Sequence, residues 1–302
     1  MNNDWNIKDD EIRIIGADRP PQKEDRPQKK TGIAWTFALL AVIPALILLL
    51  FFGNRRSVEP DEPGLFESGD TIVEVHHIVE PVLILPFGDY TDTSGLAYTE
   101  VLQKTVNDIP LTLFIPHNAV PELCLKAPDY RNKDIIFATQ AADIRRDNQK
   151  IVGAFVLKGE PLAWGLSKKG FCGIIDGTLT VGVADNSPLF EQATETGGYF
   201  FRQYPLVDNG QLVENEPKNK SIRKALCERA GEIFIAKSET TESFHDFAQA
   251  LVDLGVDNAI YLVGSSSYGF WYGKDGDVEE FSDRRVSRYR YESYILWRAK
   301  KE

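Results

Sequence analysis

One apolar segment, residues 31–53, constrains the architecture of this chain more than any other feature. It reads TGIAWTFALLAVIPALILLLFFG and carries no charged side chain. An α-helix rises about 1.5 Å per residue, so a helix of this length crosses a hydrocarbon core about 30 Å thick. Pro44 lies within the segment, and bilayer helices tolerate such a kink. The sequence therefore predicts one transmembrane helix from Thr31 to Gly53.

A cleaved signal peptide is the main alternative for this segment. The apolar region of a signal peptide normally has about 7–15 residues and lies near the N-terminus. Here a polar segment, residues 1–30, comes first, and the apolar run is longer. The stretch GADRPPQKEDRPQKK within residues 1–30 is proline-rich and charged, which predicts a disordered tail.

Basic residues on the two sides of the apolar segment predict its orientation. After the segment the nearest basic residues are Arg55 and Arg56, whereas the residues before it include Arg13, Arg19, Lys23, Arg26, Lys29 and Lys30. Cytoplasmic flanks of membrane spans are enriched in Lys and Arg. We therefore expect a single-pass protein of the cell membrane with a cytoplasmic N-terminus and a periplasmic or extracellular C-terminal domain.

The remainder of the chain divides into a linker, residues 54–70, and a domain, residues 71–302. The linker is rich in Pro, Gly and acidic residues. Helical spacing of apolar residues predicts helices at 96–108 and between Ser243 and Gly255. Short apolar or β-branched runs predict a hairpin at 269–281 and strands at 71–79, 81–87, 110–115, 133–139, 151–157, 178–184, 232–237, 259–263 and 291–298. This pattern predicts an α+β domain that has a mixed or antiparallel sheet and a few packed helices.

Composition excludes some classes of function. The formal net charge is -11, which argues against a nucleic-acid backbone as the main partner. The three cysteines and four histidines show no metal-ligand spacing, and the phosphate-binding and GxSxG motifs are missing from the sequence. We therefore expect no metal and no cofactor. The tetrapeptide SIRK, residues 221–224, matches a Ser-x-x-Lys signature but lacks its partner motifs.

Four segments resemble, in the same order, those of the phosphodiester glycosidase domain, the family of the enzyme that uncovers mannose 6-phosphate. They are FATQAADIRRDNQKIVGAFVLKGEPL (137–162), GYFFRQYPLVDNGQLV (198–213), SIRKALCERAGEIFIAKS (221–238) and FHDFAQALVDLGVDNAIYLVGSSS (244–267). The family shows ATNAG, QSGPMLV, R-N-G and LDGG motifs at these places. The resemblance extends over about residues 110–298 and implies the family's fold.

The departures from these motifs bear on catalysis. The family's Asn in ATNAG falls at Gln140, and the acid of LDGG falls at Val263. The second glycine of LDGG falls at Ser265, while the Arg of R-N-G is present as Arg223 and is followed by Lys224. The resemblance implies cleavage of sugar-1-phosphodiesters or other glycosidic bonds by acidic groups. An isopropyl group can neither transfer a proton nor hold a metal, so we expect a catalytically degenerate member.

The resemblance also implies which residues contact a ligand. Arg223 would hold a phosphate or carboxylate through its planar guanidinium. Gln140 would orient the ligand, and backbone N–H and hydroxyl groups would bind an anion along the loop of Gly264, Ser265, Ser266 and Ser267. The structural alternatives are a surface arginine, a residue that caps a strand, and a plain turn.

Three functions are compatible with the sequence. The first is a membrane-anchored, degenerate domain outside the cytoplasm, either non-catalytic or of altered activity, that binds a glycan or a sugar phosphate. The second is an active hydrolase of sugar-1-phosphodiester or other glycosidic bonds. The third is a membrane interaction protein that uses its cytoplasmic tail.

Overall fold

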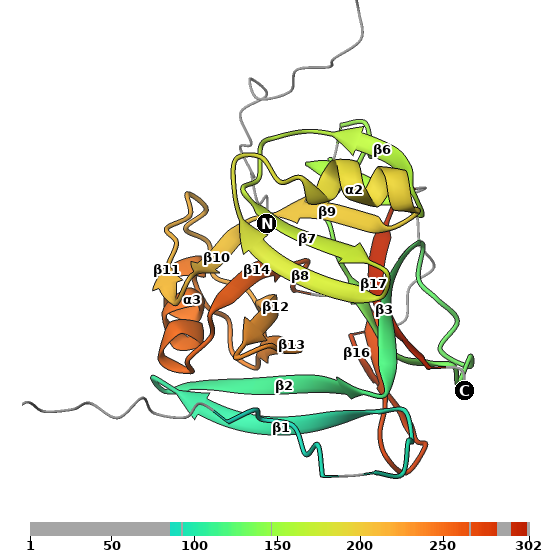
Figure 1. Cartoon of the computed structure of the whole chain (residues 1–302). Coiled ribbons are helices and arrows are strands. Elements are labelled where there is room, and N and C mark those ends of the chain that lie inside the picture. The colour runs from blue at the N-terminus through green and yellow to red at the C-terminus, as the bar shows by residue number, and fades with distance from the viewer. Residues whose placement is uncertain (1–84, 92, 146, 266, 283–290, 301–302) are drawn as a thin grey trace, which may run out of the picture. The chain divides into compact units, whose positions relative to one another are not determined.

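The computed structural model describes residues 85–300, apart from 92, 146, 266 and 283–290, and these form three antiparallel sheets and two helices (Figure 1). The predicted tail, the predicted transmembrane segment 31–53, the linker 54–70 and the predicted strand at 71–79 lie outside the described residues. Within the part of the chain that is described, no helix has the length and apolar character needed to cross a membrane.

The largest sheet has the strand order β1-β2-β13-β12-β14-β10-β11. Its pairings are antiparallel throughout. The strands are β1 (Tyr98–Val106), β2 (Ile109–His117), β10 (Pro205–Asp208), β11 (Gln211–Leu212), β12 (Lys224–Arg229), β13 (Glu232–Ser238) and β14 (Asn258–Leu262).

Two five-stranded sheets complete the fold, with the orders β16-β15-β4-β17-β3 and β6-β5-β9-β7-β8. The former contains β3 (Ala119–Leu125), β4 (Ile135–Gln140), β15 (Gly269–Tyr272), β16 (Val278–Phe281) and β17 (Ser293–Ala299). The latter contains β5 (Ala154–Leu157), β6 (Glu160–Trp164), β7 (Gly170–Ile175), β8 (Thr178–Val183) and β9 (Tyr199–Gln203), and helix α2 (Leu189–Thr196) contacts β7, β9 and β5 of this sheet.

The largest sheet separates two apolar clusters. Alternate residues of a strand point to opposite faces, so each central strand contributes to both clusters. On one face, Ala225, Phe234 and Ala259 pack with helix α3 (Phe244–Asp253). On the opposite face, side chains from the same strands, such as Leu226 and Ile260, join those of β4, β15 and β17. We call these the helix face and the inner face.

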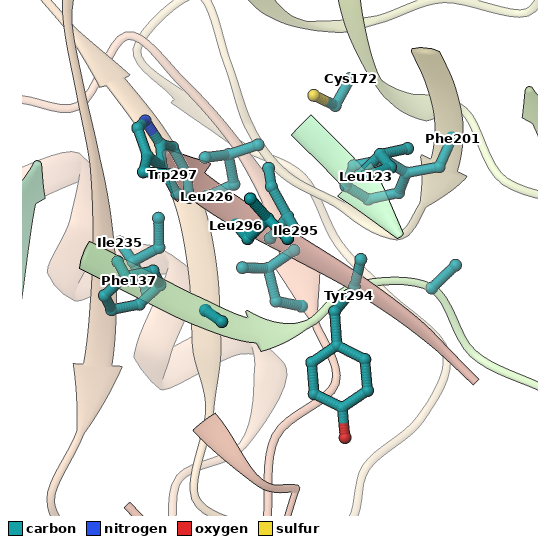
Figure 2. Packing of buried hydrophobic residues seen from close by; sticks show 14 of the residues in the cluster. Leu123, Phe137, Cys172, Phe201, Leu226, Ile235, Tyr294, Ile295, Leu296 and Trp297 are labelled. Atoms are coloured by element: carbon teal, nitrogen blue, oxygen red, sulfur yellow. The ribbon is translucent and has the colours of Figure 1, made fainter. Parts of the chain in front are cut away.

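The inner cluster draws its side chains from all three sheets. Figure 2 shows Leu226 and Ile235 near Phe137 and Leu296, with Cys172 and Phe201 farther along the same cluster. Phe137, Phe201 and Ile295 have no exposed surface. Burial of one such side chain is worth about 1.5–3 kcal/mol, so this cluster accounts for much of the stability of the domain.

Helix α3 begins and ends as the sequence predicts. The Ser243 hydroxyl accepts a hydrogen bond from the Asp246 N–H at 3.0 Å, the first half of a capping box. Gly255 follows the helix with a φ of +84°, which suits glycine at a helix end. Phe244, Phe247 and Leu251 form the buried side of the helix. The prediction for this helix is confirmed.

The predicted helix at 96–108 is wrong, because this segment is the strand β1. Its apolar residues fit helical spacing, but each residue from Tyr98 to Val106 pairs with β2. The turn consists of Asn107 and Asp108, both with positive φ, as in the tight turns that favour hairpins. The Asn-Asp pair is the local feature of the sequence that could have pointed to a hairpin.

Most predicted strands are present, with shifted ends. The segments at 110–115, 133–139, 151–157, 178–184, 232–237, 259–263 and 291–298 correspond to β2, β4, β5, β8, β13, β14 and β17, and the hairpin at 269–281 is formed by β15 and β16. The described residues of the predicted strand 81–87 are not a strand. Instead, Phe87 and Gly88 donate backbone hydrogen bonds to the carboxylate of Glu232 at 2.7 and 2.8 Å. A buried carboxylate thus fixes the segment that enters the domain.

Candidate functional site

The residues singled out by sequence come together at one end of β4, β12 and β14. Strand β14 pairs with β12 so that Leu262 lies opposite Lys224. Strand β15 pairs with β4 so that Gly269 lies opposite Thr139. The Val263 N–H donates to the Ala141 carbonyl at 3.4 Å. The loop 263–268 therefore connects the strands next to Gln140 and Arg223, which is the arrangement that the resemblance predicted.

The backbone of this loop is engaged within the protein. The Gly264 N–H donates to the Tyr261 hydroxyl at 3.0 Å. The Ser265 N–H donates to the Ile222 carbonyl at 2.8 Å, and the Ser267 N–H donates to the Gly264 carbonyl at 3.2 Å. These three N–H groups already have partners, so in this conformation they form no anion-binding nest. Ser266 lies outside the described residues.

A glycine is required at position 264 because the backbone of the loop passes close to Ile222. A Cβ atom added at Gly264 would overlap the carbonyl oxygen of Ile222 and lie 3.2 Å from the Tyr261 hydroxyl. Ser265 follows with a φ of 54°, a left-handed conformation uncommon for a residue with a side chain. Ser265 is exposed, so its hydroxyl is open to solvent.

Arg223 is buried on the helix face, with an exposed fraction of 1%. Its Nε donates to the Glu242 carbonyl at 2.9 Å, and its Nη2 donates to the Asn219 carbonyl. The guanidinium carbon lies 4.0 Å from the centroid of the Phe244 ring. Burial lowers the pKa of Arg223, and the nearby phenol of Tyr261 offsets part of that effect. An arginine remains charged under such conditions, so this one is a buried cation held by carbonyls and rings.

Gln140 ends β4 beside the loop, and its exposed fraction is 8%. It lies opposite Tyr294 of β17. Because neighbours along a strand point to opposite faces, its side chain leaves the sheet on the face opposite to that of Thr139. Contact of Gln140 with a ligand stays a prediction, as it does for Arg223 and for the loop.

Lys224 is the functional candidate that sequence reasoning missed. Its side chain points to the inner face, where it is 1% exposed. The Nζ atom lies 2.8 Å from Thr139 Oγ1, 2.6 Å from Ser267 Oγ and 4.6 Å from the centroid of the Phe281 ring. Burial, and to a smaller extent Lys237, lowers the pKa of Lys224 well below its ordinary value of 10.5. The signal in the sequence was a lysine two residues before Leu226 in an apolar strand, because residues two apart in a strand lie on the same face.

Lys224 joins three of the segments that carry the family resemblance. Thr139 belongs to the ATQA segment, Lys224 follows the Arg of the IRK segment, and Ser267 lies in the VGSSS segment. The Ser267 hydroxyl is also 2.6 Å from the Val263 carbonyl. One amine thus connects the strand end of β4 with the loop after β14.

Aromatic side chains surround the helix-face part of the site. The rings of Tyr204, Phe244 and Tyr261 contact one another with centroids 5.0 to 6.5 Å apart, and Lys168 Nζ lies over Tyr204. Burial raises the pKa of Tyr261, and the charge of Asp143 raises it further. The described residues contain no group of three or more His, Cys, Asp or Glu side chains that could hold a metal. Among the described residues, this part of the site is cationic and aromatic, and Asp143 is a carboxylate whose charge acts on Tyr261.

Comparisons with known proteins place these segments in context. The phosphodiester glycosidase family matches residues 133–291, just over half of the chain. No curated protein matches the chain significantly. Among solved structures, the catalytic domain of zebrafish N-acetylglucosamine-1-phosphodiester α-N-acetylglucosaminidase, auto-inhibited by its pro-peptide, is 14% identical, with a TM-score of 0.49 over 68% of this chain and 83% of that chain.

A hypothetical protein from Synechocystis is also 14% identical, with a TM-score of 0.48. The match covers 67% of this chain and 62% of that chain. The family match spans the ATQA, IRK and VGSSS segments, which the structure brings together at one end of the strands. The chain therefore belongs to the phosphodiester glycosidase family.

Proposed function

We propose that this protein is a catalytically degenerate phosphodiester glycosidase domain that is anchored in the cell membrane and binds a glycan or a sugar phosphate outside the cytoplasm. The domain itself follows from the family match. Anchoring is inferred from the apolar segment 31–53 and the basic residues before it.

The position of Val263 carries the proposal of degeneracy. This valine directly follows β14, and its N–H bonds to the residue after Gln140, which supports its assignment to the position of the family's LDGG acid. Its neighbours Arg223 and Lys224 are buried bases, not acids. General acid–base catalysis typically contributes about 10²–10⁴ in rate, and an aliphatic side chain contributes none of it.

Ligand binding would depend on the exposed edge of the site. The Ser265 hydroxyl faces solvent, and the Gln140 amide lies at the adjoining strand end. Hydroxyl and amide groups pair well with sugar hydroxyls and phosphate oxygens. Because the guanidinium of Arg223 is occupied by carbonyls, we assign it to holding the site together instead of to contacting ligand.

An active hydrolase remains the second candidate, and Asp143 is the observation that favours it. Its carboxylate acts on the Tyr261 phenol, which accepts a hydrogen bond from Gly264 in the loop. A carboxylate whose charge reaches this phenol could supply acid–base chemistry that the valine lacks.

Assays of the full-length chain in detergent with an N-acetylglucosamine-1-phosphodiester separate the two candidates. We expect turnover at background in the wild type and in Asp143→Asn, and measurable turnover in the double variant Gln140→Asn/Val263→Asp. Robust wild-type turnover that falls in Asp143→Asn would replace the first candidate with the second.

Binding is measured in parallel by calorimetry with N-acetylglucosamine 1-phosphate. Gln140→Ala should weaken binding by about 10-fold, since one hydrogen bond to a charged group is worth about 1.5–3 kcal/mol. Gln192→Ala, the same change at an exposed position of α2, serves as the control. Equal affinity in the two variants would contradict a role for Gln140.

A protease-protection experiment tests the proposed membrane topology. A protease added outside the cytoplasmic membrane should digest the chain beyond Arg56 and leave the first 30 residues protected. Protection of the large domain would overturn the orientation, and a soluble product cleaved near Gly53 would indicate a signal peptide.

A further inference from the structure

We propose that Ser267 and Lys224 form a nucleophile–base pair that transfers the acyl group of a neutral ester. The Ser267 Oγ atom lies 2.6 Å from Lys224 Nζ, which is hydrogen-bonding distance for proton transfer. This activity is independent of phosphodiester cleavage and of the proposed binding of a sugar phosphate.

The surroundings of Lys224 suit a neutral amine that acts as a base. Burial disfavours its charge, and among the described residues Lys237, directly across on β13, disfavours it further. A neutral amine has two N–H groups and one lone pair. Thr139 Oγ1 and the Phe281 ring can receive the two N–H groups, which leaves the lone pair for Ser267. Desolvated lysines of this kind serve as bases and nucleophiles.

The hydroxyl of Ser267 is placed to lose its proton to that amine. Its oxygen accepts a hydrogen bond from Lys224 Nζ and its O–H donates to the Val263 carbonyl, each at 2.6 Å. Once Lys224 has lost its proton, Nζ becomes an acceptor at that same distance. Ser267 retains an exposed fraction of 9%, whereas Lys224 is 1% exposed. The nucleophile therefore lies nearer the surface, and the base is shielded from water beneath it.

The same geometry argues for an uncharged substrate. The Arg223 guanidinium is held by the Glu242 and Asn219 carbonyls, and the N–H groups of Gly264, Ser265 and Ser267 have internal partners. These groups are thus not free to hold an anion beside Ser267, whereas a neutral ester needs no fixed charge there. Phe281, next to the amine, adds an apolar surface.

The reaction balances as a transfer in two stages. Ser267 Oγ bonds to the carbonyl carbon of the ester while its proton passes to Lys224 Nζ. The carbon–oxygen bond to the alcohol breaks, and the departing oxygen takes that proton. Water then attacks the acyl carbon and gives a proton to Lys224 Nζ. Ser267 Oγ takes this proton back as the carboxylic acid leaves.

A fluorophosphonate probe tests the pair on the full-length chain in detergent. The serine oxygen displaces fluoride, and mass spectrometry locates the adduct. We expect labelling at Ser267 in the wild type and in Ser94→Ala, the control at an exposed serine outside the site. We expect none in Ser267→Ala and a rate at least about 100-fold lower in Lys224→Met. An unlabelled wild type, or labelling unaffected by Lys224→Met, would overturn the proposal.

Two further measurements keep the test valid if Lys224→Met does not fold. In the wild type the labelling rate should rise with pH and reach a plateau below pH 10.5, the ordinary pKa of lysine. A rate that rises with hydroxide throughout would exclude the amine as base. Wild-type chain should also turn over p-nitrophenyl acetate but not p-nitrophenyl phosphate, and the reverse preference would exclude a neutral acyl ester.

Discussion

The two faces of the largest sheet hold two consecutive buried bases in different ways. Arg223 points to the helix face, where backbone carbonyls and the Phe244 ring surround it. Lys224 points to the inner face, where it contacts two hydroxyls and the Phe281 ring. Each is 1% exposed, and the partners described above are backbone carbonyls for Arg223 and side-chain hydroxyls for Lys224.

The difference shows how the partners of a buried base decide its role. Carbonyl oxygens can only accept hydrogen bonds, so they suit a guanidinium that never gives up a proton. Hydroxyls can accept or donate, so they suit an amine that exists with or without its proton. Arg223 therefore links the sheet to α3 and stabilises their packing. Lys224, in contrast, has the surroundings of a reactive group.

Removing the guanidinium should produce the largest loss of stability. Arg223→Met leaves the Glu242 and Asn219 carbonyls without their donor, and each buried unsatisfied group costs about 1–3 kcal/mol. We expect the free energy of unfolding in urea to fall by about 4 kcal/mol. Arg131→Met, at an arginine whose side chain is 74% exposed, is the control and should change it little. Equal losses of unfolding free energy in the two variants would mean that Arg223 does not stabilise the helix face.

A side chain at position 264 should disturb both faces at once. The Cβ of Gly264→Ala would overlap the Ile222 carbonyl and crowd the Tyr261 hydroxyl. We expect a loss of about 1–3 kcal/mol, the usual range for overpacking, together with slower labelling of Ser267. Gly210→Ala, at a glycine with positive φ and open space around it, separates backbone strain from overlap.

The buried amine of Lys224 on the inner face should make the free energy of unfolding depend on pH. Because burial lowers the pKa of Lys224 in the folded protein, the unfolded chain binds its proton more tightly. Between the folded pKa and 10.5 stability should rise with pH by about 1.4 kcal/mol per unit, and at lower pH this contribution is absent.

Urea unfolding between pH 7 and 10 measures this slope. Lys224→Met should remove it, whereas Lys133→Met, at an exposed lysine, should not. Identical slopes for the wild type and Lys224→Met would show that the amine is not buried in solution, and the contrast between the two faces would fail.

The smallest expected effect concerns the helix that covers Arg223. Ser243→Ala removes the hydroxyl that caps the Asp246 N–H and should cost about 1 kcal/mol. Ser243→Thr retains a capping hydroxyl and should recover most of that loss. Thermal unfolding of both variants measures the difference. A loss several times larger would mean that the cap, and not the guanidinium, fixes α3 to the sheet.

Sequence reasoning was reliable where local pattern and tertiary environment agree. The spacing of Phe244, Phe247 and Leu251, with Ser243 before them, predicted α3 because one apolar stripe and one cap specify a helix. The same reasoning failed at Tyr98–Val106, where the apolar spacing fitted a helix and pairing with β2 imposed a strand. Only the Asn107–Asp108 turn indicated the hairpin, because both residues tolerate positive φ.

In the candidate site, too, some features could be predicted from the sequence and others only from the tertiary structure. The resemblance alone predicted that Gln140, Arg223 and the loop after Val263 would meet at one end of the strands. It also identified Val263 as the place where an acid is missing. It treated Lys224 only as a departure from a motif, since nothing in one sequence says which residues a lysine will contact.

By itself, then, the sequence determined the apolar segment 31–53, the alternation that builds the strands, and the motif order that marks the family. The tertiary structure decided that Arg223 and Lys224 are buried on opposite faces and that Ser267 lies against the amine. The physical reason is that periodicity is a local property of the sequence. Burial and hydrogen bonding depend on segments that are distant in the chain, as with Lys224 and Ser267, which are 43 residues apart.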